Sequence, residues 1–141
     1  MNDKYFLDTN IFVYAFDSMD SEKQGKANDL IKSALTNHIG CTSYQVIQEF
    51  LNVVTRKFAV PLSIPDCEKY LNTVLSPLSE VYASSTDLYL QSLDILERWQ
   101  FSFYDSLIIS AALQSNCKIL YTEDLQHQQK IQGLTICNPF V

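Results

Sequence analysis

Short apolar runs alternate with longer stretches of helical periodicity along most of the chain. The apolar runs predict strands at residues 4–7, 39–42, 81–83, 118–121 and 134–137. The longer stretches predict helices at about 10–16, 21–37, 44–58, 65–75, 86–99 and 104–114. Strands that alternate with helices favour an α/β fold, a three-layer α/β/α sandwich with a central, mostly parallel sheet.

Four local patterns mark the expected helix starts and faces. Ser21 and Gln24 form a capping box that opens the second helix. Ser43 caps the third helix, and Pro65 suits the first turn of the fourth. The third helix carries two apolar stripes, which are Val46, Phe50 and Val53 on one side and Ile47, Leu51, Val54 and Phe58 on the other.

Composition favours one compact domain spanning residues 1–141. Three glycines and four prolines in 141 residues leave no room for a flexible linker, and 47% of the residues are apolar. No apolar run approaches the roughly 20 residues of a membrane span. The first residues lack the features of a signal peptide, so we expect a cytoplasmic protein. Four scattered cysteines without a C-x-x-C pair predict buried thiols rather than a zinc site.

The formal net charge of −6 argues against a general nucleic-acid binder, because phosphate contacts dominate such affinity. An acidic enzyme can still act on RNA when divalent cations cover its carboxylates or a basic partner supplies phosphate contacts. No Gly-rich phosphate loop and no G-x-S-x-G elbow occurs, which argues against nucleotide-dependent enzymes and serine hydrolases.

Acidic residues collect where one edge of the predicted sheet is expected. Asp8 directly follows the first strand, and Glu123 and Asp124 follow a later one. Glu49 and Asp105 lie in early turns of helices that face the same edge. Ligands of open α/β sheets bind beyond the carboxyl ends of the strands, so this edge is the expected site. For each acid, helix capping or interaction with the helix dipole is the alternative interpretation.

Clustered carboxylates require a counter-ion. Two like charges ~4 Å apart repel by about 4 kcal/mol at an effective dielectric of 20. Oxygen ligands without clustered Cys or His favour Mg²⁺ or Mn²⁺. Such an ion activates water and stabilises charge on a phosphate, so the residues favour metal-assisted phosphodiester hydrolysis.

The acidic motifs also carry a family resemblance. Residues 5–14 (YFLDTNIFVY) resemble the opening of a PIN domain, the nuclease fold of VapC-type toxins. Residues 43–50, 103–108 and 119–125 resemble the second, third and fourth motifs of that family, and residues 138–140 resemble its ending. The motifs occur in order across essentially the whole chain.

The resemblance implies a Mg²⁺- or Mn²⁺-dependent endoribonuclease. It implies that the catalytic and metal-binding carboxylates are Asp8, Glu49, Asp105 and Asp124. It makes Asn10 and Thr122 supports that orient ligands or water. The family acid usually stands two residues after the Ser/Thr, which selects Asp124 and leaves Glu123 a supplementary role.

Some neighbouring residues have two interpretations. Asn52 and Arg56 share a helix face with Glu49, so they are candidates for contact with substrate or a partner as well as for solvated surface positions. His127 is interpreted as a surface residue. The aromatic residues near Asp105 are interpreted as core packing, with base stacking as the alternative; they are Trp99, Phe101, Phe103 and Tyr104.

The biological role is open at this stage. The resemblance implies an RNA substrate, a homodimer and a toxin paired with an antitoxin, and a basic antitoxin segment suits the acidic cleft. The alternatives are a non-toxin RNA-processing nuclease of the same fold, a phosphoacceptor signalling domain and a non-catalytic interaction protein.

Overall fold

The computed structural model describes residues 3–58 and 61–141, and it contains one six-stranded sheet in the order β3-β2-β1-β4-β6-β5. The strands are β1 (Tyr5–Leu7), β2 (Gly40–Ser43), β3 (Glu80–Tyr82), β4 (Ile119–Tyr121), β5 (Lys130–Ile131) and β6 (Leu134–Cys137). All neighbouring strands pair in parallel except β5 and β6. The predicted mostly parallel sheet is therefore confirmed.

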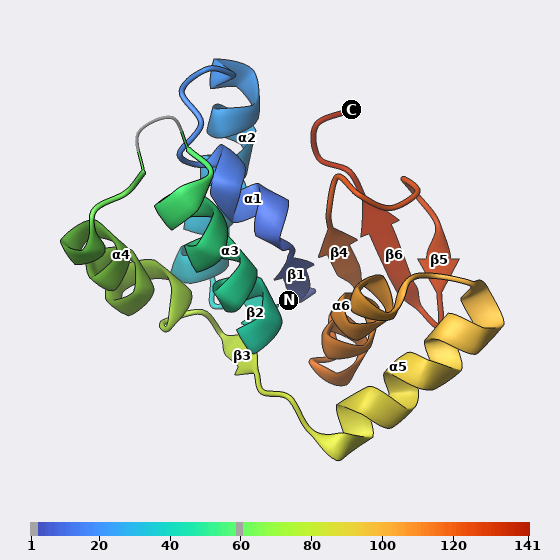
Figure 1. The fold of residues 1–141 in the computed structure, drawn as a ribbon. Coiled ribbons are helices and arrows are strands. Elements are labelled where there is room, and N and C mark those ends of the chain that lie inside the picture. The colour runs from blue at the N-terminus through green and yellow to red at the C-terminus, as the bar shows by residue number, and fades with distance from the viewer. Residues whose placement is uncertain (1–2, 59–60) are drawn as a thin grey trace.

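The helices form layers on both faces of this sheet. They are α1 (Thr9–Tyr14), α2 (Ser21–Thr36), α3 (Tyr44–Arg56), α4 (Ile64–Tyr70), the π-helical turn η1 (Leu71–Leu75), α5 (Thr86–Trp99) and α6 (Phe103–Gln114). Figure 1 shows α1 to α4 on one side of the sheet and α5 and α6 on the other. The chain moves from β1 to β2 to β3 in one direction and then returns to β4. Right-handed crossovers in opposite directions place their helices on opposite faces.

Buried apolar side chains join the layers. Phe6 and Leu7 of β1 are fully buried, as expected for a central parallel strand. Phe12 of α1 meets Phe50 of α3 edge-on, with ring centroids 6.2 Å apart. All four thiols are free; Cys41, Cys67 and Cys117 are buried as predicted, whereas Cys137 is only partly buried. None of the described helices is long and apolar enough to cross a membrane.

Two helix predictions are wrong in detail. The N-cap of α2 is Asp20, whose side chain accepts the Lys23 backbone N–H, so Ser21 is the first helical residue rather than the cap. Gln24 does not take part in the proposed capping box, and its side-chain amide donates to the Ala15 carbonyl instead. In α3 the fully buried stripe combines Val46 and Phe50 with Val54, because residues four apart form one straight ridge against the core.

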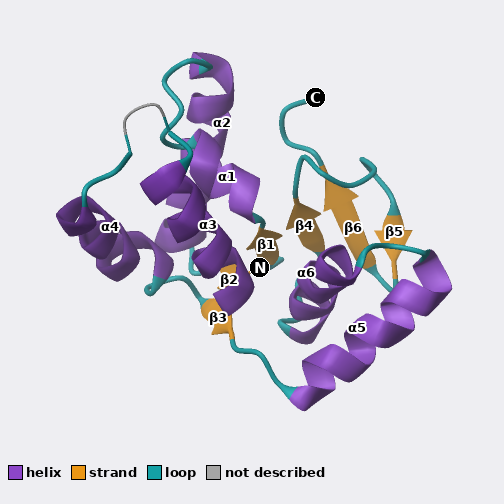
Figure 2. Cartoon of the chain, in the orientation of Figure 1, coloured by secondary structure: helices purple, strands orange, loops and turns teal. Residues whose placement is uncertain are grey.

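Of the hairpin formed by β5 and β6, the sequence predicted only the second strand, β6. Gln132 and Gly133 connect the strands with φ values of 51° and 90°, which suits a tight two-residue turn. Figure 2 shows the short β5 at the edge of the sheet. A strand of two residues is too short to produce an alternating pattern, so β5 has no period in the sequence.

Candidate active site

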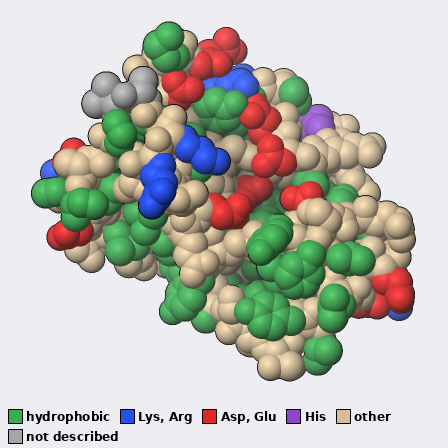
Figure 3. Space-filling view, viewed as in Figure 1, with side chains coloured by type: hydrophobic (Ala, Val, Ile, Leu, Met, Phe, Trp, Pro, Cys, Tyr) green, Lys and Arg blue, Asp and Glu red, His purple; other side chains and the backbone are tan. Residues whose placement is uncertain are grey.

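The site lies where the strand order reverses, beyond the carboxyl ends of the neighbouring strands β1 and β4. Asp8 follows β1 directly, and Thr122 follows β4 directly. A cleft of about 430 Å³ opens beside them, lined by Thr9, Asn10, Val13, Tyr14, Asp17, Glu49, Val53, Glu123 and Asp124. Figure 3 shows acidic side chains gathered in the middle of one face of the molecule, with apolar side chains beside them.

Asp8 is the buried member of this group, with a relative exposure of only 8%. Its Oδ1 accepts the Thr9 backbone N–H at 2.7 Å, so it caps α1. Its Oδ2 accepts the Thr122 hydroxyl at 2.8 Å. Burial, aided by the charges of Asp124 and Glu49, raises the pKa of Asp8 to about 6 although these two hydrogen bonds lower it. A carboxylate kept buried at this cost needs a purpose beyond capping.

Asn10 links the end of β4 to the start of α1. Its Nδ2 donates to Asp124 Oδ2 at 3.1 Å and to Thr122 Oγ1 at 3.4 Å. Its Oδ1 accepts the Glu123 backbone N–H at 3.3 Å. Asn10 therefore donates a hydrogen bond to the carboxylate of Asp124, and Thr122 donates one to that of Asp8.

Glu49 stands on the opposite wall, in the second turn of α3. Its Oε1 accepts the Thr9 hydroxyl at 3.4 Å and the Gln45 side-chain amide at 3.2 Å. Loss of hydration raises its pKa, and so do the charges of Asp124 and Asp105. Asp105 lies in the first turn of α6, where Ser102 caps its backbone N–H at 3.1 Å. Asp8, Glu49 and Asp124 therefore lie within electrostatic reach of one another, whereas Asp105 acts on Glu49 and does not line the cleft.

The residues present fit a hard divalent cation. Within residues 3–58 and 61–141, no three Asp, Glu, His or Cys side chains converge as a ready-made metal cage. Mg²⁺ does not need one, since it usually keeps several waters and takes only one or two carboxylates. The donors are all oxygen atoms. Burial is the main cause of the raised pKa values of Asp8 and Glu49, and repulsion between neighbouring carboxylates adds to it. A divalent cation relieves this repulsion.

Two other predicted residues lie outside the cleft, and a third is already paired within it. Asn52 and Arg56 are exposed and do not line the cleft, although their neighbour Val53 does. Glu123 lines the cleft, but its carboxylate is bound by Lys23 and Tyr14. The two acids therefore differ in their partners: Lys23 and Tyr14 bind the carboxylate of Glu123, whereas Asn10 donates to that of Asp124. The sequence had left their roles ambiguous.

The interpretation of the nearby aromatic residues as core packing is wrong for most of them. Trp99, Phe103 and Tyr104 are exposed, and only Phe101 packs against the core. Residues at the start of α6 follow an irregular segment, so periodicity carries no information about their burial. His127 is exposed as predicted, and its Nδ1 accepts the Asn138 backbone N–H at 2.9 Å.

Sequence reasoning missed four polar residues that contact the acids, which are Thr9, Tyr14, Lys23 and Gln45. Gln45 had a local signal, since it lies four residues before Glu49 on one helix face. Lys23 had none, because 100 residues separate it from Glu123.

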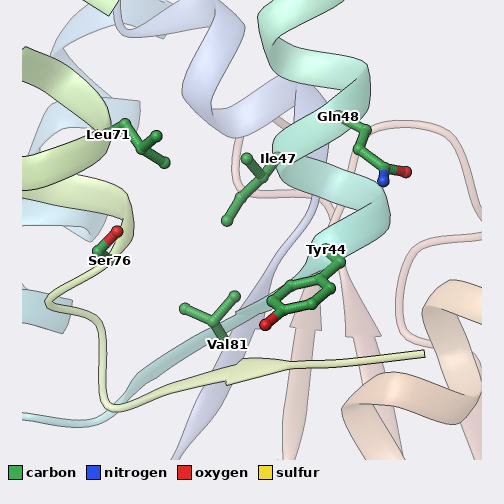
Figure 4. A pocket seen from close by; sticks show the side chains of 6 residues that line it. All are labelled: Tyr44, Ile47, Gln48, Leu71, Ser76 and Val81. Carbon is green, nitrogen blue, oxygen red and sulfur yellow. The ribbon is translucent and has the colours of Figure 1, made fainter. Parts of the chain in front are cut away.

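A second hollow lies between α3, η1 and β3. Figure 4 shows Ile47, Leu71 and Val81 pointing into it, with Tyr44 and Ser76 at its rim. Its lining contains no carboxylate, His, Cys or Lys, so it offers no charged group that would hold a metal ion. The acidic cleft is the better candidate for an active site.

The fold is that of a known class. The family model of the PIN domain matches residues 5–133, and the chain belongs to the PIN domain family. No curated protein matches the chain in sequence.

Solved structures share the fold at low sequence identity. A toxin–antitoxin complex from Klebsiella pneumoniae is 16% identical with a TM-score of 0.69, covering 96% of this chain and 98% of that one. VapC20 of Mycobacterium tuberculosis, a toxin that cleaves the sarcin–ricin loop, is 20% identical with a TM-score of 0.66, covering 86% and 90%. DNA-bound VapBC2 of Rickettsia felis is 24% identical with a TM-score of 0.64, covering 94% and 96%. These likenesses confirm the predicted fold.

Proposed function

We propose that this chain, as one domain spanning residues 1–141, is a Mg²⁺- or Mn²⁺-dependent endoribonuclease and the toxin of a toxin–antitoxin pair. The observation that carries the proposal is the buried Asp8 at the strand-order reversal of a PIN fold, joined by Thr122 and Asn10 to Asp124. VapC20, a structural neighbour, is a toxin that cleaves an RNA loop. RNA is therefore the substrate class we propose for this chain.

The residues of the cleft would divide the work. Asp8, Glu49, Asp105 and Asp124 would hold the ion, which when bound activates water and stabilises charge on the phosphate. Thr122 and Thr9 orient the Asp8 oxygens by donating to them. Glu49 is the best proton acceptor for an attacking water, because it reaches the cleft surface and its pKa is raised.

We expect purified protein to cleave a mixed RNA substrate with Mg²⁺ or Mn²⁺ and not with a chelator. Asp105→Asn should lower the cleavage rate by about a hundredfold or more, because one oxygen ligand becomes a neutral amide. Asp29→Asn is the matched control, since Asp29 is exposed on α2 and outside the cleft. Cleavage that survives chelation, or that is equal in both variants, would overturn the proposal.

We also propose that Asn52 and Arg56 contact RNA at the rim of the cleft. Arg56 is exposed, one turn beyond the cleft-lining Val53. Arg56→Gln should raise KM, leave kcat unchanged and lower the salt slope of log KM by about one. Lys57→Gln removes the same charge at the neighbouring residue and should change neither KM nor the salt slope. Equal effects in the two variants would assign the result to net charge alone.

An antitoxin with a basic segment is the partner we propose. Besides Glu123, which Lys23 already pairs, the cleft is lined by Asp17, Glu49 and Asp124, so a cationic side chain would complement it. Two structural neighbours are toxin–antitoxin or VapBC complexes. The wild-type chain expressed alone should arrest bacterial growth, and co-expression with the product of the adjacent gene should restore it. Growth unaffected by an RNA-cleaving chain would favour a non-toxin RNA-processing nuclease.

A homodimer is the assembly we propose. Large apolar side chains are exposed on the starts of α3 and α6 and along α5, namely Tyr44, Phe103, Tyr104, Tyr89, Leu90 and Leu93; of these, Tyr89, Phe103 and Tyr104 line one hollow. Figure 3 shows apolar side chains massed next to the acidic group. Exposed patches of this kind mark interaction surfaces. Light scattering that gives a monomer mass at micromolar concentration would contradict the dimer.

A further inference from the structure

Lys23, in the first turn of α2, contacts the acidic cleft from outside the predicted motifs. Its Nζ lies 2.6 Å from Glu123 Oε2 and donates to the Tyr14 hydroxyl at 3.1 Å. The Tyr14 hydroxyl in turn donates to Glu123 Oε1 at 2.7 Å. The same Nζ lies 4.6 Å from the Tyr14 ring centre and 5.4 Å from that of Phe140. We call these four residues the Lys23 clamp.

The clamp occupies both carboxylate oxygens of Glu123 with donors from the protein. Partial burial opposes ionisation, but the hydrogen bonds from Lys23 and Tyr14 prevail and lower the pKa of Glu123. The two side chains of the ion pair keep only 30% and 28% of their exposure. An ion pair that is partly shielded and shared with a hydroxyl and two rings has a defined geometry, unlike most surface pairs.

The clamp is connected to the carboxylates of the site through the segment 122–124. The Glu123 backbone N–H donates to Asn10 Oδ1, and Asn10 Nδ2 donates to Asp124 Oδ2. The Asp124 backbone N–H donates to Thr122 Oγ1 at 3.1 Å, and that hydroxyl donates to Asp8. Fixing the Glu123 side chain therefore fixes the backbone that aims Asp124 and Thr122.

We propose that Lys23 is a positioning residue, which anchors segment 122–124 through Glu123 and so holds Asp124 in its orientation for divalent-cation binding. Glu123 serves as the anchor point and is not itself a ligand. This inference rests on the proposed function, because it assumes that the cleft binds a divalent cation.

The sign of one effect separates this role from the alternatives. A lysine beside an acidic cleft repels a cation, so its removal by electrostatics alone would tighten metal binding. If Glu123 were a ligand, removing Lys23 would also free it to bind and tighten the site further. Only an anchoring role predicts that loss of the positive charge weakens metal binding.

The experiment is calorimetric titration of Mn²⁺ into the full chain and its variants. Lys23→Met and Glu123→Gln should each bind Mn²⁺ about tenfold more weakly, and the double variant no more weakly than the weaker single one. Lys23→Arg should restore nearly wild-type affinity. Lys26→Met is the matched control, since Lys26 lies on the same helix and its contact with Glu22, at 3.6 Å, is on the surface.

Each outcome has a clear meaning. Circular dichroism of the metal-free variants checks that they are folded. If Lys23→Met is not folded, the Mn²⁺ affinity of Lys23→Arg is used in its place. Affinity of Lys23→Met equal to or tighter than wild type would overturn the inference and leave the nuclease standing. An equal loss in Lys26→Met would assign the effect to α2 in general and overturn it too. A wild-type chain that binds no Mn²⁺ would overturn both this inference and the proposed metal dependence.

Discussion

Asp8→Asn is expected to abolish RNA cleavage while making the metal-free protein more stable at neutral pH. Asp8 is nearly fully buried, and burial raises the pKa of its carboxyl to about 6. The unfolded chain has an ordinary value of about 3.9. Between pH 4 and 6 the folded state therefore binds the extra proton, so stability from this group falls as pH rises through that window. Above pH 6 the ionised Asp8 costs about 3 kcal/mol, as an upper bound.

An asparagine at position 8 removes that cost. Its Oδ1 can still accept the Thr9 N–H, and its amide can donate to the Thr122 hydroxyl oxygen. In chelator, urea unfolding at pH 7.5 should give a higher free energy of unfolding for Asp8→Asn, and the difference should shrink toward pH 4. Mn²⁺ should stabilise the wild type alone. A variant less stable than wild type at pH 7.5 in chelator would contradict the assigned electrostatics, whatever its activity.

Gly40→Ala is expected to be among the most destabilising single substitutions in the chain. A Cβ at Gly40 would lie 2.2 Å from Ala34 Cβ and 3.1 Å from Ala34 Cα. Ala34 is fully buried in α2, so relief requires moving the helix away from β2 rather than rotating a side chain. We expect a loss of about 3 kcal/mol in the free energy of unfolding and a fall of about 10 °C in Tm.

Gly25→Ala gives the matched control for this change. Gly25 lies within α2, and nothing lies within 4 Å of a Cβ added there. The substitution should stabilise the protein by about 0.5–1 kcal/mol, because alanine loses less entropy in a helix. Thermal unfolding of both variants measures the expected loss of stability in Gly40→Ala and the expected gain in Gly25→Ala. Equal stability of Gly40→Ala and wild type would mean that α2 and β2 pack less closely than described.

The stability of the site and the chemistry of the site oppose each other at Asp8. The fold keeps a carboxylate that would be more stable as an amide. It buries this group, which raises its pKa, and places two other acids near it, which add to the rise. Functional groups commonly carry such a cost, and perturbed ionisation marks them. The proposed cation reconciles the two, because its binding favours the ionised form.

Local patterns in the sequence determined most of the elements and the order of the acidic motifs. The apolar run Tyr5–Leu7 and the cap at Ser43 act over a few residues, so their strand and helix were predictable. Because parallel strands end at a common edge, Asp8 and Asp124 were also expected to meet. The pattern failed where the signal was short or geometric, as for β5 and for the cap at Asp20.

Only the tertiary structure decided which side chains surround those acids. Lys23 meets Glu123 across 100 residues, and Thr9 meets Glu49 across 40. Such contacts depend on how α1, α2 and α3 pack together, and no periodicity along one element records that packing. The same is true of the exposure of Tyr104, because the identity of an aromatic residue does not show whether its side chain faces the core or solvent. The sequence thus determined the chemistry available at the sheet edge, while packing determined its geometry, because distant contacts arise only when the layers close.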